Sequence, residues 1–158
     1  MFESAVRGCM NSPEGKRSKR KKHKNSHARE IALQGLYQIE VAGQPVSAVL
    51  NLGWLNEKPG AAEMELSKKI IESVCENQKD LDQVVDAFSN KDSTQISTIV
   101  RCILRMGVME IMMGELSGTI IIDDLLELTR RYDGDESVGF VNGILDGFRR
   151  EKEDQEKE

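Results

Sequence analysis

The chain has 158 residues and a formal net charge of −5, with 39 % hydrophobic, 4 % aromatic and 31 % charged residues. This length suits one domain, and the apolar content excludes a chain that is disordered throughout. Neither a membrane span nor a secretory signal is evident, and three widely spaced cysteines agree with reduced thiols, so we expect a cytoplasmic protein with no membrane partner.

A basic segment precedes an acidic one. Residues 1–29 hold nine basic and two acidic residues, a net charge of +7, whereas residues 30–158 have a net charge of −12. Such a basic block repels itself and buries nothing. We therefore expect residues 1–26 to form a disordered arm whose partner is a polyanion. The alternative is a tail that serves solubility or targeting.

Helical periodicity begins directly after this arm. Apolar residues recur every three or four positions over Ala28–Val41, and the pattern is interrupted at Gly43–Pro45. The same spacing predicts three further helices in the first half of the chain, over Val46–Trp54, Met64–Val74 and Leu81–Phe88.

The second half of the chain predicts three more helices. Ser97 is a suitable N-cap, and Gly114 is suited to the helix C-terminus. A further helix is expected from Thr119, although Ile120–Ile122 is also compatible with a strand. The last helix is predicted over 136–149, followed by a frayed charged tail over 151–158.

These patterns indicate an all-α protein. Six or seven helices with short connections favour antiparallel packing in a bundle, and the sequence offers no convincing strand. Residues 27–150 are expected to form this helical domain.

The sequence offers little for catalysis. The two histidines, His23 and His27, lie at the arm, and no cysteine pair has the spacing of a zinc site. Phosphate-binding glycine loops are also missing. Asp123, Asp124 and Glu127 are interpreted as solvated residues at a helix start. We therefore expect no enzyme, cofactor or metal.

One aromatic residue lies on a second stripe of the first predicted helix. Arg29, Leu33 and Tyr37 recur every four positions and form a second stripe on the first helix. Tyr37 is either packed by a second layer of helices or exposed. If it is exposed, unpaired bases can stack on its ring while the arm binds phosphates.

Three glycines are aligned on the last helix. Gly139, Gly143 and Gly147 are spaced by four residues, and glycine weakens a helix interior. Close approach of another helix is the favoured explanation, and contact with a ligand backbone is the alternative.

Charged residues also occur on the helix that begins after Ser97. Arg105 and Glu110 lie on an otherwise apolar helix, so each is expected to have a structural partner. Arg101 lies one turn nearer the start of the helix and is expected to be free to meet a phosphate.

Four segments resemble a known family. They read AREIALQGLY, ILRMGVMEI, LLELTR and FVNGILD, at residues 28–37, 103–111, 125–130 and 140–146. Their order and spacing resemble the NusB family of bacterial transcription antitermination factors over about residues 26–150. The resemblance implies two small helical bundles and no catalytic activity. It also implies binding of single-stranded boxA RNA together with the ribosomal protein NusE, within an antitermination complex on RNA polymerase in ribosomal RNA operons.

The resemblance also implies which residues contact RNA. In this family the basic N-terminus, the first helix and the start of the last helix do so. The matching candidates here, together with Arg101, are Lys21, Lys22, Lys24, Arg29, Tyr37, Glu136 and Phe140.

Three positions depart from the family pattern. Val100 replaces a frequent glutamate, and Gly139 replaces a basic residue that often precedes the Phe-Val-Asn-Gly motif. Residues 122–125 read Ile-Asp-Asp-Leu where Ile-Asn-Glu-Ala is common. We expect the long lysine-rich arm to offset the missing cation at Gly139.

Two other hypotheses remain. The chain could be an adaptor that binds a ribosomal protein without specific RNA recognition. It could also be the targeting module of an RNA methyltransferase, but no catalytic domain follows Glu158 in this sequence.

Overall fold

The computed structural model describes residues 25–157. Over this range it contains helices and connecting turns and no strand, which confirms the all-α prediction. The helices are α2 (Ser26–Ala42), α3 (Val46–Leu50), α4 (Ala61–Glu76), α5 (Gln78–Phe88), α6 (Thr98–Met113), α7 (Gly118–Tyr132) and α8 (Val138–Glu156), with short 3-10 turns η1 (Ser93–Gln95) and η2 (Asp135–Ser137).

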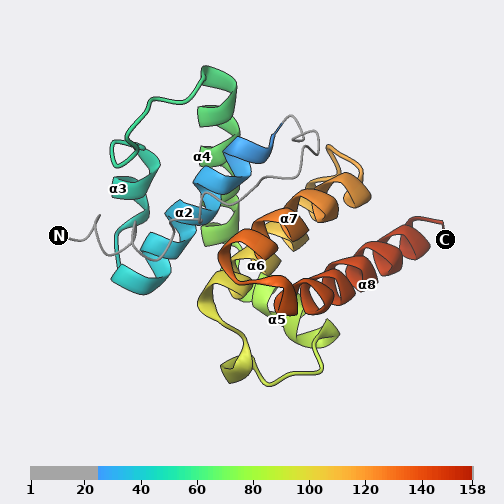
Figure 1. The fold of residues 1–158 in the computed structure, drawn as a ribbon. Helices are drawn as coiled ribbons and strands as arrows, with labels where there is room; N and C mark the ends of the chain where they lie inside the picture. Colours follow the sequence, from blue (N-terminus) through green and yellow to red (C-terminus); the bar gives the residue numbers. More distant parts are fainter. Residues whose placement is uncertain (1–24, 158) are drawn as a thin grey trace.

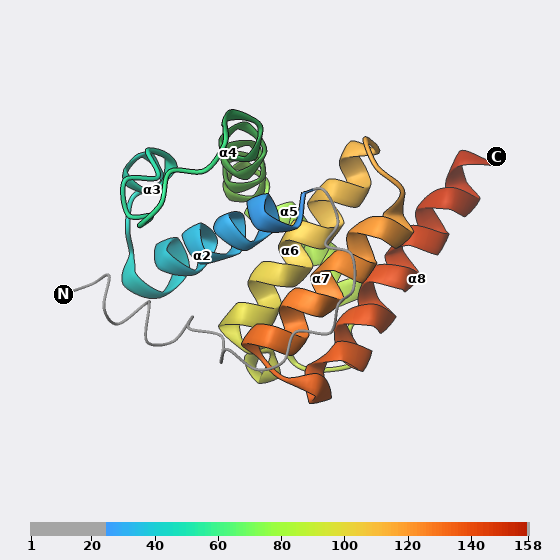
Figure 2. The ribbon, with the colours of Figure 1, turned by 45° about the horizontal axis from the view of Figure 1, so that its top comes forward.

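The helices form two groups around α6. Helices α2, α3 and α4 lie on one side of the molecule, and α5, α7 and α8 lie on the other (Figure 1). Helices α6, α7 and α8 run side by side in alternating directions (Figure 2). Helix α6 contacts α2, α4, α5, α7 and α8, so it is the central element that joins the two groups.

The central position of α6 follows from its sequence. Its residues are apolar on almost every face, and eleven of its sixteen residues are buried. The Ser97 hydroxyl accepts a hydrogen bond of 3.3 Å from the Val100 amide, and Gly114 ends the helix with a φ of 69°. Both capping predictions are therefore confirmed, and they fix the register at which α6 crosses the core.

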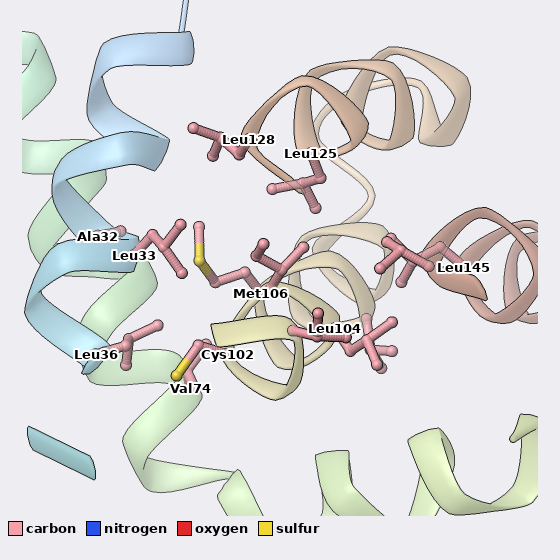
Figure 3. Close-up of a cluster of buried hydrophobic side chains, with 14 of the residues drawn as sticks. Ala32, Leu33, Leu36, Val74, Cys102, Leu104, Met106, Leu125, Leu128 and Leu145 are labelled. Carbon is pink, nitrogen blue, oxygen red and sulfur yellow. The ribbon is translucent and has the colours of Figure 1, made fainter. Parts of the chain in front are cut away.

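Three neighbouring helices contribute side chains to one core around α6. Leu33 and Leu36 of α2 point toward Met106 and Cys102 of α6, while leucines of α7 and α8 approach from the other side (Figure 3). Leu125 and Leu145 are fully buried there. The two helical groups consequently share a continuous apolar interior.

Some boundaries differ from the prediction. The second helix ends at Leu50, because the chain turns at Leu52, where φ is 58°, and the Trp54 indole N–H donates to the Val49 carbonyl at 2.9 Å. The N-terminal cap of α7 is Ser117 and not Thr119. Residues Ile120–Ile122 are helical, as preferred over a strand.

The charged C-terminal segment was predicted to be frayed, but it is helical as far as Glu156. Helix α8 continues through it, and ion pairs spaced four residues apart, such as Arg149–Glu153 at 2.9 Å, support the extra turns. Lys152 also donates a hydrogen bond of 2.7 Å to the Ile111 carbonyl near the end of α6. This contact satisfies a helix-end carbonyl, so the tail belongs to the helical domain.

Residues 1–24 of the predicted arm, which was expected to span 1–26, lie outside the described residues. Its last position, Ser26, is the first residue of α2, so the helical domain begins slightly earlier than expected.

Candidate nucleic-acid interface

Arg29, predicted as an RNA contact, is buried. Its side chain is 0 % exposed and donates to Glu110 of α6 at 2.7 and 3.0 Å. A third bond of 2.6 Å reaches Asp124 of α7, whose other oxygen accepts from the Ser26 hydroxyl at 2.6 Å. With its guanidinium enclosed by these carboxylates, Arg29 ties the start of α2 to α6 and α7.

The charge balance of this cluster is negative. Burial works to lower the pKa of Arg29, yet its bonds and charges with Glu110 and Asp124 raise that pKa above the ordinary value. Burial raises the pKa of Glu110, and Arg29 only partly offsets this effect.

Asp124 was expected to be solvated and is instead only 3 % exposed. The sequence signal was Glu110, a charge on an apolar helix that required a partner.

The second stripe of α2 does not form a surface. Leu33 is fully buried against α6, and Tyr37 is half-buried and packs against the core. Tyr37 was expected to be either packed by a second layer of helices or exposed. The first alternative therefore applies to much of this face of α2. Tyr37 retains partial exposure, so a role in binding stays a prediction for that residue alone.

Arg101 is not the free cation that its position suggested. Its side chain is 14 % exposed, and its Nη1 atom lies 3.5 Å from an Asp82 oxygen of α5. The same carboxylate accepts two bonds from Arg105, of 2.8 and 3.0 Å, and Arg105 also pairs with Glu40 at 3.4 Å. The structural role of Arg105 is confirmed, and Arg101 shares its Asp82 partner with Arg105.

Glu136 and Phe140 lie where α7 meets α8. Glu136 is exposed in η2, and Phe140 is half-buried and packs on the core. Asp133 fixes this corner, since it accepts a hydrogen bond of 3.1 Å from Ser97 and another from Ser137. The sequence did not reveal this link between the starts of α6 and α8.

The glycine line on α8 is mostly open. A Cβ atom added at Gly139 or Gly143 would meet nothing within 4 Å, whereas one at Gly147 would lie 3.2 Å from a carbon of Phe88. Close packing of a helix was therefore the wrong explanation for the first two glycines. They leave a face without side chains beside Phe140.

The predicted site residues do not gather at one place. Arg29 is bonded to Glu110 near the end of α6 and to Asp124 in the middle of α7, while Phe140 lies in the first turn of α8. The neighbouring Glu30 accepts a hydrogen bond from Tyr132 at the C-terminal end of α7. Lys21, Lys22 and Lys24 lie outside the described residues.

Among residues 25–157, no helix is both long and apolar enough to cross a membrane. Within the same range, no cluster of three or more His, Cys, Asp or Glu side chains is arranged to hold a metal ion.

Sequence comparisons identify similar proteins over most of the chain. The model of the NusB family matches residues 26–150. A transcription antitermination protein NusB from Leptospira biflexa is 31 % identical over 122 residues, which cover 76 % of this chain and 87 % of the relative. The Sorangium cellulosum protein of the same name is 33 % identical over 124 residues, which cover 77 % and 88 %.

Structural comparisons give the same fold. NusB of T. maritima superposes with a TM-score of 0.73 at 26 % identity, covering 82 % of this chain and 93 % of that one. A crystal structure of antitermination factors NusB and NusE in complex with dsRNA gives a TM-score of 0.65 at 21 % identity, covering 79 % and 95 %. At this lower identity, the second match supports the fold alone.

Proposed function

This chain belongs to the NusB family, and we propose that it is a transcription antitermination factor that binds boxA-type RNA together with NusE. In this proposal it acts in the cytoplasm, joins the antitermination complex on RNA polymerase and suppresses termination in ribosomal RNA operons. The observation that carries the proposal is the family match over 26–150, which includes nearly the whole helical domain. The proposed role is non-catalytic.

The distribution of charge supports two different partners. Residues 1–29 have a net charge of +7, and the rest of the chain has a net charge of −12. The basic segment suits RNA phosphates, and the acidic helical domain suits a basic ribosomal protein.

The start of α8 offers the chemistry for RNA bases. Glu136 is exposed and presents a carboxylate that can accept a hydrogen bond from a base amino group. The ring of Phe140 lies one helical turn further on, beside the open backbone at Gly139 and Gly143. An unpaired base can stack on such a ring where no side chain obstructs it.

The separation of the two regions suggests how RNA binds. The basic segment joins the domain at Ser26, which is bonded to Asp124 in the middle of α7, whereas Phe140 lies in the first turn of α8. We therefore infer that single-stranded RNA extends from the start of α2 past the end of α7 to the start of α8.

A titration tests this proposal. Labelled boxA-type RNA and a scrambled RNA of equal length are titrated with the full chain, with and without NusE, over a range of salt concentrations. We expect a preference for boxA-type RNA that NusE strengthens. If about five phosphates are bound, the logarithm of affinity should fall with the logarithm of salt at a slope near −3.5. Equal affinity for both RNAs in the presence of NusE would contradict the proposal.

A protein-only adaptor remains the second candidate. One observation favours it: Arg29 and Arg101, two predicted RNA contacts, are each paired with a carboxylate inside the domain, Glu110 and Asp82 respectively. In that case NusE would bind normally while both RNAs bound weakly and equally.

A further inference from the structure

The start of α8 lacks a cation of its own. Between Val138 and Gly147 the helix contains no basic residue. The first one, Arg149, is engaged with Asp146 at 2.7 Å and with Glu153 at 2.9 Å. Phosphates of an RNA strand at Phe140 would therefore need a positive charge from another element.

Lys91 provides such a charge from the connection between α5 and α6. Its ammonium nitrogen lies 4.4 Å from the centroid of the Phe140 ring. The residue is exposed, although it is 49 positions away from Phe140 in the sequence. The tertiary structure alone brings this lysine and this ring together.

The backbone of the connection holds Lys91 in place. The Ser89 hydroxyl accepts a hydrogen bond of 3.1 Å from the Lys91 amide and donates one of 3.1 Å to the Lys91 carbonyl. These two bonds order the backbone from which the Lys91 side chain extends. Arg101, in contrast, is held by Asp82.

We propose that Lys91 binds the phosphate of the nucleotide whose base stacks on Phe140. The inference rests on the proposed function and adds a residue from a different element to the same site. An ammonium and a base cannot occupy the same face of one ring. On binding, the ammonium moves from the ring to the adjacent phosphate, where it can donate up to three hydrogen bonds, and the ring becomes available to the base.

The neighbouring charges make this cation necessary. Glu136 is exposed near the start of α8 and would repel a phosphate. Arg130 and Arg131 are the basic residues that precede this corner in the sequence, and both are paired. Arg130 pairs with Asp135 at 3.1 Å and with Glu127 at 2.6 Å, and Arg131 pairs with Glu30 at 2.9 Å. Lys91 therefore offsets the acidic corner and lets Glu136 contact a base rather than reject the strand.

The test compares three variants of the full chain in the presence of NusE. Lys91→Gln removes the charge and keeps most of the length, and Lys91→Arg keeps the charge. Lys58→Gln is the matched control, because Lys58 is also exposed but lies in the connection between α3 and α4. Affinity for boxA-type RNA is measured over a range of salt concentrations, and thermal unfolding verifies that each variant is folded.

Loss of one phosphate contact has a defined signature. We expect Lys91→Gln to weaken binding about two- to fivefold and to reduce the steepness of the salt dependence by about 0.7. Lys91→Arg and Lys58→Gln should match the unsubstituted chain in both measurements.

The possible failures are distinguishable. If the unsubstituted chain prefers boxA-type RNA and Lys91→Gln binds it equally well, the Lys91 inference is wrong and the proposed function stands. Weaker binding with an unchanged salt dependence would also overturn it, since Lys91 would then only position the ring. If the unsubstituted chain shows no preference for boxA-type RNA, both proposals fail.

Discussion

Arg29 and Glu110 are 81 positions apart in the sequence and form two parallel hydrogen bonds in the interior, at 2.7 and 3.0 Å. The pair joins the first described helix to the central one. Since Asp124 binds the remaining side of the guanidinium at 2.6 Å, all three helices depend on one cation. An arginine next to a basic segment thus serves the fold, and its guanidinium is enclosed by carboxylates.

Replacing this cation should destabilise the domain strongly. We expect Arg29→Met to lower the free energy of unfolding by about 3–5 kcal/mol, because Glu110 and Asp124 would remain buried without their cation. Urea denaturation measures the change. Arg150→Met is the control, since this side chain is 71 % exposed and its loss should change stability by about 0.5 kcal/mol or less. Similar stability for both variants would contradict this role of Arg29.

Two glycines in helix interiors should respond in opposite ways to alanine. A Cβ atom at Gly107 would lie 2.6 Å from Leu145 Cδ2 and 3.0 Å from Leu125 Cδ1, so Gly107→Ala should destabilise by about 1–3 kcal/mol. At Gly143 a Cβ atom would meet nothing within 4 Å, and Gly143→Ala should stabilise by up to about 1 kcal/mol. Thermal unfolding of both variants tests the pair, and a stabilised Gly107→Ala would refute the packing argument.

The buried thiol of Cys102 should weaken the fold at alkaline pH. Burial raises its pKa from 9.0 to about 12. Between these values the unfolded chain loses the thiol proton while the folded chain keeps it. The contribution of the Cys102 thiol to the free energy of unfolding is therefore fully present below pH 9. It declines by about 1.4 kcal/mol per pH unit as the pH rises toward 12.

Chemical denaturation between pH 8 and 11 measures this decline. Cys102→Ala should reduce the slope, although it also leaves a small cavity that lowers stability at every pH. Tyr132, whose pKa is raised from 10.0 to about 12 by burial and by its bond to Glu30, contributes a similar decline above pH 10. An unchanged slope in Cys102→Ala below pH 10 would contradict the assignment.

Removal of the basic segment should reduce RNA affinity while the fold is retained. Deletion of residues 1–24 removes eight basic residues and leaves α2 intact from Ser26. We expect weaker binding of boxA-type RNA and a shallower salt dependence, with NusE binding unchanged. The comparison uses fluorescence titrations of the full and shortened chains at equal salt. Equal RNA affinity would show that the segment has another purpose and would favour the adaptor.

The sequence alone determined the elements and the family. Apolar spacing predicted the helices, Ser97 and Gly114 marked both ends of α6, and four motifs indicated the NusB family. These features succeed because periodicity, helix capping and glycine conformation depend on residues close together in the chain. The length of α8 was not predicted correctly, because it depends partly on the hydrogen bond that Lys152 donates to the Ile111 carbonyl near the end of α6.

Only the tertiary structure decided which charged and aromatic side chains are available. The periodicity of α2 showed two stripes, but it could not reveal that α6 and α7 cover the second one and enclose Arg29. Likewise, no local pattern connects Lys91 with Phe140 or Arg101 with Asp82. Burial and ion pairing arise between elements distant in sequence, because a charge inside a protein must find its partner wherever packing places one.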